Sequence, residues 1–398
     1  MSKSISIHGL IKDAGGASRI VNKRRESYAG ASSVPDPKDH IRELADALHP
    51  AKMTFKVVGI REASPTSRTF RFESGDGHIP VFQCGQYVNF RLKIGQSVLS
   101  RPYSISSAPY EARGENPFFE ITVRRNVPYL VPDYLFENVR VGDTLEGSLP
   151  FGNFYWEPMR DSKEIVALAG GSGITPFMSM AKEVAHGKMQ GCKLTILYGS
   201  VKANDIVLKD ELDAIQAECP DVKVVHVLSD EPDWDGEKGF ISKDIIAKYS
   251  GEDTTYMFCG PRAMFEFVQK ALSELNVPGR RFRHDVVNNP ADISKMPGYP
   301  AGTEEKTFKI TVVRGIHEDV IDADAKETVA VAIERAGIAI DTHCHNGECG
   351  MCRSHLLSGD VYVPESNDGR RMMDKEMGWI HPCSSWPLSD LKIKIPIM

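Results

Sequence analysis

Four of the eight cysteines lie in the last 55 residues of this 398-residue chain, and their spacing restricts what that region can form. Four residues separate Cys344 from Cys349, two separate Cys349 from Cys352, and thirty separate Cys352 from Cys383. The remaining cysteines are scattered along the rest of the chain: Cys84, Cys192, Cys219 and Cys259. An even number of cysteines is compatible with disulfide bonds, but the tight C-terminal spacing indicates a metal centre.

The C-terminal spacing matches the C-x4-C-x2-C…C pattern of a [2Fe–2S] cluster. Such a cluster requires four thiolates to hold two irons and two bridging sulfides, and N–H donors to offset its negative charge. Gly347 and Gly350 lie inside the cysteine loop, where a side chain would obstruct backbone amides that approach sulfur. We therefore predict four cluster ligands: Cys344, Cys349, Cys352 and Cys383.

Two other metal centres compete with this interpretation. A four-cysteine zinc site usually contains two close cysteine pairs of similar form, and only one pair here is that close. A Rieske centre takes two histidine ligands. His343 and His345 merely flank Cys344, and no second Cys-x2-His segment exists. Both alternatives therefore fit the spacing less well.

Composition and charge limit the classes of function. The chain is 41% hydrophobic and 26% charged, proportions typical of globular proteins. Its formal net charge of −6 gives no general attraction to nucleic acid or anionic membranes. No apolar run approaches the ~20 residues that span a bilayer, and the N-terminus lacks the apolar centre of a signal peptide. We expect a cytoplasmic protein that neither binds nucleic acid nor spans a membrane.

The first half of the chain divides into two segments. Residues 1–51 form an extension with a linker-like stretch near 30–37 and one short amphipathic helix. That helix carries its apolar residues on one side: Ile41, Leu44, Ala45 and Leu48. Residues 52–158 show apolar residues with period two, punctuated by turn residues about every ten positions. This pattern predicts a small antiparallel β-barrel or sandwich.

The second half divides into three segments. Residues 159–286 alternate expected strands (165–169, 194–198, 222–227 and 255–258) with helices that begin near Thr175, Val207, Ser242 and Arg262. This alternation predicts a doubly wound parallel sheet. Residues 287–305 form a linker rich in Pro, Gly and Asn. Residues 306–398 predict two strands, a helix over 329–336 and the cysteine loop.

A glycine-rich turn, Gly-Gly-Ser-Gly-Ile-Thr-Pro, occupies residues 170–176 after the first of these strands. Backbone amides at the start of the following helix suit a pyrophosphate. Thr175 is expected to cap that helix, and Pro176 fits its first turn. The turn departs from the G-x-G-x-x-G dinucleotide pattern because Pro176 stands where the third glycine would be. Alone, it also fits ordinary strand-to-helix geometry.

Two further motifs make the combination specific. Arg-Pro-Tyr-Ser occupies residues 101–104, and Cys-Gly-Pro-Arg-Ala-Met occupies 259–264. Together with the glycine turn, and in this order, they resemble the ferredoxin–NAD(P)H reductase family of flavoproteins over residues 52–286. The sequence C-H-N-G-E-C-G-M-C, with His-Pro-Cys at 381–383, resembles plant-type ferredoxin domains. That resemblance implies an α+β β-grasp fold for residues 306–398.

The reductase resemblance implies a flavin site. Arg101 would bind the flavin phosphate as a permanent cation, Tyr103 would stack on the isoalloxazine ring, and the Ser104 hydroxyl would lie near its reactive nitrogen. The flavin chain would contact main-chain groups of three consecutive residues: Thr122, Val123 and Arg124. Taken singly, Arg101 could instead form a surface ion pair and Tyr103 could be a core aromatic residue.

The same resemblance implies a nicotinamide site. The nucleotide would be lined by residues of the glycine turn: Gly171, Gly173, Thr175 and Pro176. Cys259, Gly260 and Pro261 would lie close to the nicotinamide ring, although Cys259 taken singly could be an inert buried thiol. Ser104 and Cys259 are the residues expected to take part in catalysis.

Two departures bear on the cofactors. Many members hold the flavin phosphates with a G-x-x-S segment, but residues 129–132 here are Tyr-Leu-Val-Pro. FMN therefore stays open beside FAD, which we favour. Ser200 and Lys202 could accept the 2′-phosphate of NADPH, but no arginine stands there, so we prefer NADH.

The order of the segments resembles fused reductases that supply electrons to oxygenases. We predict an NAD(P)H-dependent reductase that passes electrons through flavin to the [2Fe–2S] cluster and on to a partner redox protein, such as an oxygenase component. The linker would keep the cluster near the flavin. One alternative is direct reduction of a small oxidant, such as a ferric complex or a quinone. Another is a non-catalytic iron–sulfur module. No motif indicates the acceptor or the oligomeric state.

Overall fold

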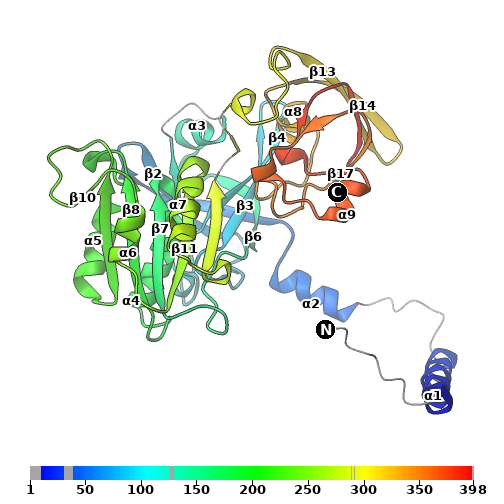
Figure 1. The fold of residues 1–398 in the computed structure, drawn as a ribbon, viewed down its shortest axis with the longest axis horizontal. Helices are drawn as coiled ribbons and strands as arrows, with labels where there is room; N and C mark the ends of the chain where they lie inside the picture. The colour runs from blue at the N-terminus through cyan, green and yellow to red at the C-terminus, as the bar shows by residue number, and fades with distance from the viewer. Residues whose placement is uncertain (1–9, 31–38, 126–129, 288, 291, 397–398) are drawn as a thin grey trace. The chain divides into compact units, whose positions relative to one another are not determined.

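The computed structural model describes residues 10–30, 39–125, 130–287, 289–290 and 292–396, which divide into two units after Leu48 (Figure 1). The first unit contains helices α1 (Leu10–Ala29) and α2 (His40–Leu48). α2 is the expected amphipathic helix, and none of its residues is buried. α1 was not expected, since its residues show little helical periodicity. The linker-like stretch lies mostly outside the described residues.

The second unit begins with the predicted antiparallel barrel, whose strands are β1 (Met53–Ser64), β2 (Ser67–Ser74), β3 (Tyr87–Ile94), β4 (Ser97–Ser104), β5 (Phe119–Arg124) and β6 (Thr144–Phe151). They lie in the order β4-β3-β6-β1-β2-β5. A bridge between Ile105 and Ile121 joins the β4 end of the sheet to the β5 end. Alternate side chains point inward, and the interior is filled by fully buried phenylalanines: Phe55, Phe70, Phe72, Phe90 and Phe119. Helices η1 (Pro109–Ala112) and α3 (Leu130–Glu137) connect the later strands.

A parallel sheet follows, as predicted, with strands β7 (Glu164–Gly170), β8 (Lys193–Ser200), β9 (Val222–Leu228), β10 (Glu237–Lys238), β11 (Thr254–Pro261) and β12 (Phe282–Val287). Its helices are η2 (Gly171–Ile174), α4 (Thr175–Ala185), η3 (Ala203–Asp205), α5 (Lys209–Glu218), α6 (Lys243–Lys248), α7 (Arg262–Glu274) and η4 (Gly279–Arg281). The strand order is β10-β9-β8-β7-β11-β12. The order reverses between β7 and β11, which is where sheets of this kind bind ligands.

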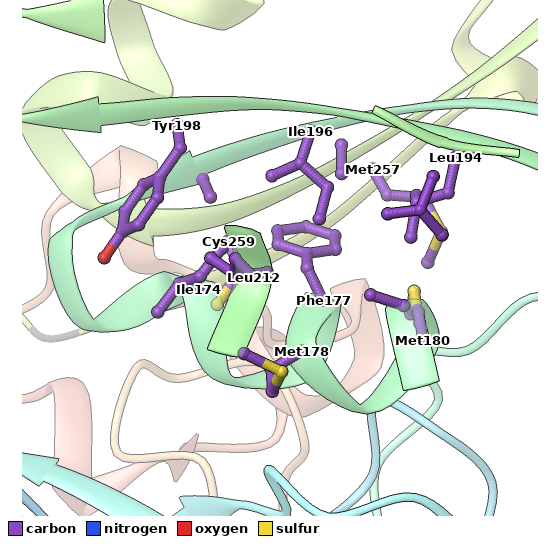
Figure 2. Packing of buried hydrophobic residues seen from close by; sticks show 14 of the residues in the cluster. Ile174, Phe177, Met178, Met180, Leu194, Ile196, Tyr198, Leu212, Met257 and Cys259 are labelled. Carbon is purple, nitrogen blue, oxygen red and sulfur yellow. The ribbon is translucent and has the colours of Figure 1, made fainter. Parts of the chain in front are cut away.

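The parallel sheet is buried on both faces. Ile165 and Ala167 of β7 belong to a hydrophobic cluster with Phe177 of α4, and Figure 2 shows Phe177 beside residues of the neighbouring strands. Val166 and Leu168 belong to a second cluster with residues of α6 and α7. Successive side chains of a strand point to opposite faces, so this near-continuous apolar run requires helices on both sides.

The C-terminal region contains more strands than the two that we predicted. They are β13 (Thr307–Arg314), β14 (His317–Asp324), β15 (Ser354–Ser358), β16 (Val361–Tyr362), β17 (Trp379–Ile380), β18 (Trp386–Pro387) and β19 (Leu391–Lys394). Five form a mixed sheet, β14-β13-β19-β15-β17, and β16 pairs with β18. The helices are α8 (Val329–Arg335), η6 (Glu365–Asn367), α9 (Met372–Glu376) and η7 (Pro382–Ser384). The five later strands have two to five residues each, too few to show a clear period.

The segment over residues 287–305 is not the free tether that its composition indicated. Asn289 donates a hydrogen bond to the Cys383 carbonyl at 2.7 Å. Tyr299 donates to the Ala325 carbonyl at 3.2 Å and is buried in a small cluster with Trp386. The short helix η5 (Ile293–Lys295) lies within this segment. Its described residues are therefore fixed on the C-terminal domain.

In the described part of the chain, no helix is both long enough and apolar enough to cross a membrane.

Candidate functional site

Tyr103 and Ser104 end strand β4, where they pair with Val88 and Tyr87 of β3. The Tyr103 ring lies 6.3 Å from the ring of Phe90, centroid to centroid. Burial raises the pKa of the Tyr103 hydroxyl, so Tyr103 remains neutral at physiological pH. A neutral aromatic side chain at the rim of the barrel suits stacking on a planar ring.

Arg101 lies two residues earlier in β4 and forms an ion pair with the C-terminal domain. Its Nη1 atom lies 2.9 Å from Oε1 and 2.8 Å from Oε2 of Glu334 in α8, and 2.7 Å from the Ser100 carbonyl oxygen. Burial raises the pKa of the Glu334 carboxyl, while Arg101 opposes that shift. Among the described residues, none accepts a hydrogen bond from the Nε or Nη2 atoms of Arg101. These two donors form one edge of the guanidinium, and such an edge can bind two oxygens of a phosphate. Arg101 therefore fits the phosphate of a flavin.

The Thr122–Arg124 segment of β5 is fixed by its side chains. Thr122 exchanges hydrogen bonds with the hydroxyls of Thr69 (2.9 Å) and Ser106 (3.1 Å). Arg124 donates to the Thr66 hydroxyl at 3.1 Å and forms an ion pair with Asp205 of the parallel-sheet domain. β5 pairs with β2 along its length, while its other edge has the single Ile105–Ile121 bridge. Main-chain groups are therefore available for the contacts that we expected.

The glycine turn at 170–176 approaches the end of β11 too closely for side chains. A Cβ atom on Gly173 would lie 2.1 Å from the Cys259 carbonyl oxygen. Gly171 has a φ angle of +55°, and a Cβ atom there would lie 2.8 Å from Nη1 of Arg124. The backbone contact at Gly173 therefore requires glycine, and the positive φ at Gly171 favours it. The turn lies at the reversal of strand order, as a nucleotide site in this fold requires.

The expected capping role of Thr175 is wrong. Thr175 is the first residue of α4, and the residue before it, Ile174, makes no side-chain cap. The Thr175 hydroxyl donates to the Ser172 carbonyl at 3.1 Å instead of accepting from a backbone amide. The short helix η2 runs directly into α4, so the residue before Thr175 is already helical and Thr175 is the first residue of α4 instead of its cap. Pro176 occupies the first turn, as predicted.

Cys259 ends β11 with only 1% of its surface exposed. Its side chain lies among the hydrophobic residues that include Ile174 (Figure 2). Burial raises the pKa of its thiol, so the thiol is neutral and is not a nucleophile. The next residue, Gly260, lies close to the glycine turn: a Cβ atom there would be 3.2 Å from the Gly170 nitrogen. Pro261 immediately precedes α7.

The four C-terminal cysteines lie together. The Cys352 and Cys383 sulfurs are 3.4 Å apart, Cys344 contacts both Cys349 and Cys383, and the amides of Asn346 and Cys349 donate to the Cys344 sulfur. In the described part, no three His, Cys, Asp or Glu side chains surround a position for one single ion. A [2Fe–2S] cluster needs two thiolates at each of two irons, so grouped thiols with amide donors fit that cluster.

The structure gives the glycines of the cysteine loop a further reason, beside the one expected. A Cβ atom on Gly347 would lie 2.3 Å from the Asn367 carbonyl oxygen and 2.5 Å from the Ser384 hydroxyl. Gly350 adopts a φ angle of +71°, which side chains disfavour. The protein around the loop excludes a side chain at Gly347, and the backbone conformation disfavours one at Gly350. The expected role of both glycines toward the cluster sulfurs stays a prediction.

The sequence did not reveal the residues that join the cysteine loop to the barrel. His345 donates from Nε2 to the Ser100 carbonyl at 2.6 Å, and Asn89 donates to the Thr342 carbonyl at 3.0 Å. Glu334 is fully buried although it is an acidic residue. The sequence offered one indication, an acidic residue on the apolar face of α8. That residue alone does not show which residue it pairs with.

Three family models match the chain in order: an oxidoreductase FAD-binding domain over residues 54–156, an oxidoreductase NAD-binding domain over 167–270, and a 2Fe-2S iron-sulfur cluster binding domain over 315–387. The model boundaries fall within the barrel, the parallel-sheet domain and the C-terminal domain. FAD, NAD(P)H and a [2Fe–2S] cluster are therefore the cofactors and substrate that the chain is built to bind.

Relatives and solved structures agree with these matches. The chain is 26% identical to the glycine betaine monooxygenase reductase subunit of Chromohalobacter salexigens over 82% of this chain and 91% of the relative. It is 31% identical to NADH-cytochrome b5 reductase 1 of Dictyostelium discoideum over 50% of this chain and 69% of the relative. The structure of phthalate dioxygenase reductase superimposes with a TM-score of 0.63 and 20% identity over 87% of this chain and 98% of that one, which establishes a shared fold. The chain therefore belongs to the ferredoxin–NAD(P)H reductase-like flavoproteins with a C-terminal plant-type [2Fe–2S] ferredoxin domain, and it is an NAD(P)H oxidoreductase.

Proposed function

We propose that this chain oxidises NADH in the cytoplasm and delivers the electrons, through FAD and the [2Fe–2S] cluster, to a separate redox protein such as an oxygenase component. One observation carries the proposal. His345, which adjoins the cluster ligand Cys344, donates a 2.6 Å hydrogen bond to Ser100 of β4, three residues before Tyr103. The cluster loop is thus in direct contact with the strand proposed to hold the flavin.

Residues of the barrel would bind and orient the flavin. Arg101 offers its open guanidinium edge to the phosphate, Tyr103 offers a neutral aromatic face, and Ser104 offers a hydroxyl near the reactive nitrogen. The main chain of Thr122–Arg124 would support the flavin chain. When bound, the flavin accepts an electron pair as hydride from the nicotinamide, and the cluster carries electrons singly.

Residues at the reversal of strand order would bind the nicotinamide nucleotide. Gly171 and Gly173 add no side chain to the turn that would lie against the pyrophosphate. The Thr175 amide already donates to the Ser172 carbonyl and Pro176 has no N–H, so the glycine turn, and not the start of α4, would have to supply the contacts. Cys259 and Gly260 would border the nicotinamide ring. Because its thiol is neutral, Cys259 would act by shape and not by proton transfer. We therefore assign it a positioning role.

A preference for NADH has its own support at the end of β8. Lys202, the cation that a 2′-phosphate would need, lies 3.6 Å from the Asp230 carboxylate. Both side chains are more than half exposed, so the carboxylate weakens the attraction of Lys202 for a phosphate without cancelling it. A free 2′-hydroxyl does not depend on that attraction.

An anaerobic titration with NADH tests the pathway. We expect stoichiometric NADH to bleach the flavin absorbance and then to produce the paramagnetic signal of a reduced [2Fe–2S] cluster. Cys349→Ser should abolish the cluster signal and leave flavin reduction intact. Cys219→Ser, which changes a cysteine outside the cluster, is the matched control and should retain both. A titration with NADPH should need a much higher concentration.

Two outcomes would overturn the proposal. A cluster that stays oxidised while the flavin bleaches would exclude the intramolecular pathway. Reduction of a purified oxygenase component at the same rate by Cys349→Ser and the unaltered protein would exclude the cluster as the point of exit. Retained reduction of ferricyanide by that variant is expected, because a small oxidant can take electrons from the flavin directly.

A further inference from the structure

Glu334 is a buried carboxylate of the ferredoxin domain that contacts the flavin domain. It is fully buried in α8, and Nη1 of Arg101 lies within 2.9 Å of both its oxygens. The Thr342 hydroxyl donates to Oε1 at 3.2 Å, and the Ser100 amide lies 3.4 Å from the same atom. An unpaired carboxylate at such a depth is strongly destabilising, so the pair with Arg101 is maintained.

The ion pair with Glu334 uses only one nitrogen of the guanidinium, Nη1. Arg101 has five N–H donors in one rigid plane. Glu334 and the Ser100 carbonyl engage Nη1, and among the described residues none accepts from Nε or Nη2. Holding Nη1 fixes the plane, and so fixes the direction in which the Nε–Nη2 edge points. That edge is the one proposed to bind the flavin phosphate.

We infer that Glu334 is a positioning residue that orients Arg101 for the flavin phosphate, so that FAD binding and docking of the ferredoxin domain stabilise each other through one guanidinium. This inference rests on the proposed role of Arg101 in the flavin site. Coupling of two binding events through a shared group is reciprocal. FAD should therefore hold α8 against β4, and loss of the Glu334 charge should weaken FAD binding.

The test measures both directions of the coupling in the full-length protein. The FAD dissociation constant is measured by flavin fluorescence on protein stripped of flavin, for the unaltered chain and for Glu334→Gln. Glu327→Gln is the matched control, because it removes an equivalent pair with Arg335, at 2.5 Å, on the exposed side of α8. Hydrogen exchange of the α8 and β4 peptides is followed with and without FAD. The paramagnetic signal of the reduced cluster reports that the ferredoxin domain is intact.

We expect Glu334→Gln to raise the FAD dissociation constant about tenfold, within the usual range of coupling between sites, and Glu327→Gln to leave it unchanged. FAD should slow exchange in α8 of the unaltered protein and of Glu327→Gln, but not of Glu334→Gln. A dissociation constant within twofold of the unaltered value, or tighter FAD binding, would overturn the inference. The comparison of α8 exchange with and without FAD needs no variant, so equal exchange in the unaltered protein would overturn it too.

Failure of the inference can be distinguished from failure of the flavin-site assignment. If Arg101→Ala weakens FAD binding while Glu334→Gln does not, Arg101 binds the flavin without the coupling. If Arg101→Ala leaves the FAD dissociation constant unchanged, the proposed role of Arg101 itself is wrong.

Discussion

The flavin barrel meets its two neighbouring domains in different ways. Toward the parallel-sheet domain, Cys84 and Phe154 belong to the same hydrophobic cluster as Phe177 of α4, and the rings of Phe154 and Phe177 lie 5.8 Å apart edge to face. Toward the ferredoxin domain, the contacts between described residues include hydrogen bonds such as Asn89 to the Thr342 carbonyl, the Arg101–Glu334 ion pair, and the His343 ring, which lies 4.4 Å from the ring of Phe151. No hydrophobic cluster of the described residues spans this boundary. The ferredoxin domain keeps a hydrophobic cluster of its own.

This difference predicts that one domain boundary stays closed and that the other can open. A shared hydrophobic cluster makes the barrel and the parallel-sheet domain one body, because parting them would expose apolar surface to water. Hydride transfer needs that fixed geometry. A polar boundary exchanges protein partners for water at a small net cost. We therefore expect the first boundary to resist perturbation and the second to open more readily.

Removal of a ring from the shared cluster should have the largest effect. Phe177→Ala should lower the free energy of unfolding by about 3–5 kcal/mol, since it deletes a fully buried aromatic side chain. Urea unfolding followed by flavin fluorescence measures the loss. Phe267→Ala removes a half-exposed ring from α7 and should change stability by less than about 0.5 kcal/mol. Equal losses in the two variants would show that the shared cluster does not hold this boundary.

A methyl group at the closest contact in the nucleotide site should have the next largest effect. In Gly173→Ala the new Cβ atom meets the Cys259 carbonyl oxygen, so the turn must shift away from β11. We expect the KM for NADH to rise about tenfold, or roughly 1.4 kcal/mol. Gly279→Ala is the control, because its Cβ atom meets open space. An unchanged KM in Gly173→Ala would contradict the proposed nucleotide site.

The polar boundary should respond more weakly. Asn89→Ala removes the hydrogen bonds from the side-chain amide to the Thr342 carbonyl and to the Ser100 hydroxyl, and should cost about 1–2 kcal/mol. We expect faster hydrogen exchange in the ferredoxin segments that face β3 and β4, with unchanged flavin reduction by NADH. Asn138→Ala, at an exposed position, should alter neither. A loss as large as that of Phe177→Ala would remove the contrast between the two boundaries.

Acid should weaken the first boundary at Asp205. Burial alone would raise the pKa of this carboxyl. Hydrogen bonds from Ser64, Thr66 and Arg124 and the charge of Arg124 outweigh burial, so the pKa is lowered below its ordinary value of 3.8. A carboxyl with a lowered pKa in the folded state stabilises the protein above its unfolded pKa, and that stabilisation is lost as pH falls through the folded pKa. We expect Asp205→Asn to flatten the acid limb of a plot of unfolding midpoint against pH. An unchanged limb would contradict a stabilising role for Asp205.

Much of the fold follows from local patterns in the sequence. Period-two phenylalanines predicted the barrel, alternating apolar runs predicted the parallel sheet, and the cysteine spacing predicted that the four C-terminal cysteines lie together. Contacts between domains were not predictable, because they depend on which helix face meets which strand. Glu334 illustrates this: its neighbours Ile333 and Arg335 mark a helix, but nothing near it in sequence indicates Arg101.

Composition also misled where it was used alone. Proline, glycine and asparagine indicate an irregular backbone in residues 287–305, but they do not show whether that backbone is free or docked. Tyr299 was the residue that could have shown it, because an aromatic ring within a linker needs a surface to cover it. The capping role predicted for Thr175 was wrong for a different reason. One turn of 3-10 helix precedes α4, so the residue before Thr175 is already helical.

The docked segment after β12 sets how far the cluster can travel. Val287 ends β12, and Asn289 is already bonded to Cys383. Two residues of extended chain span only about 7 Å. If the ferredoxin domain leaves the barrel while it keeps this segment, it pivots on a short arm and cannot carry its electrons across a wide gap. We therefore expect a partner protein to come to the cluster, and the reductase to hold the cluster in place instead of carrying it to the partner.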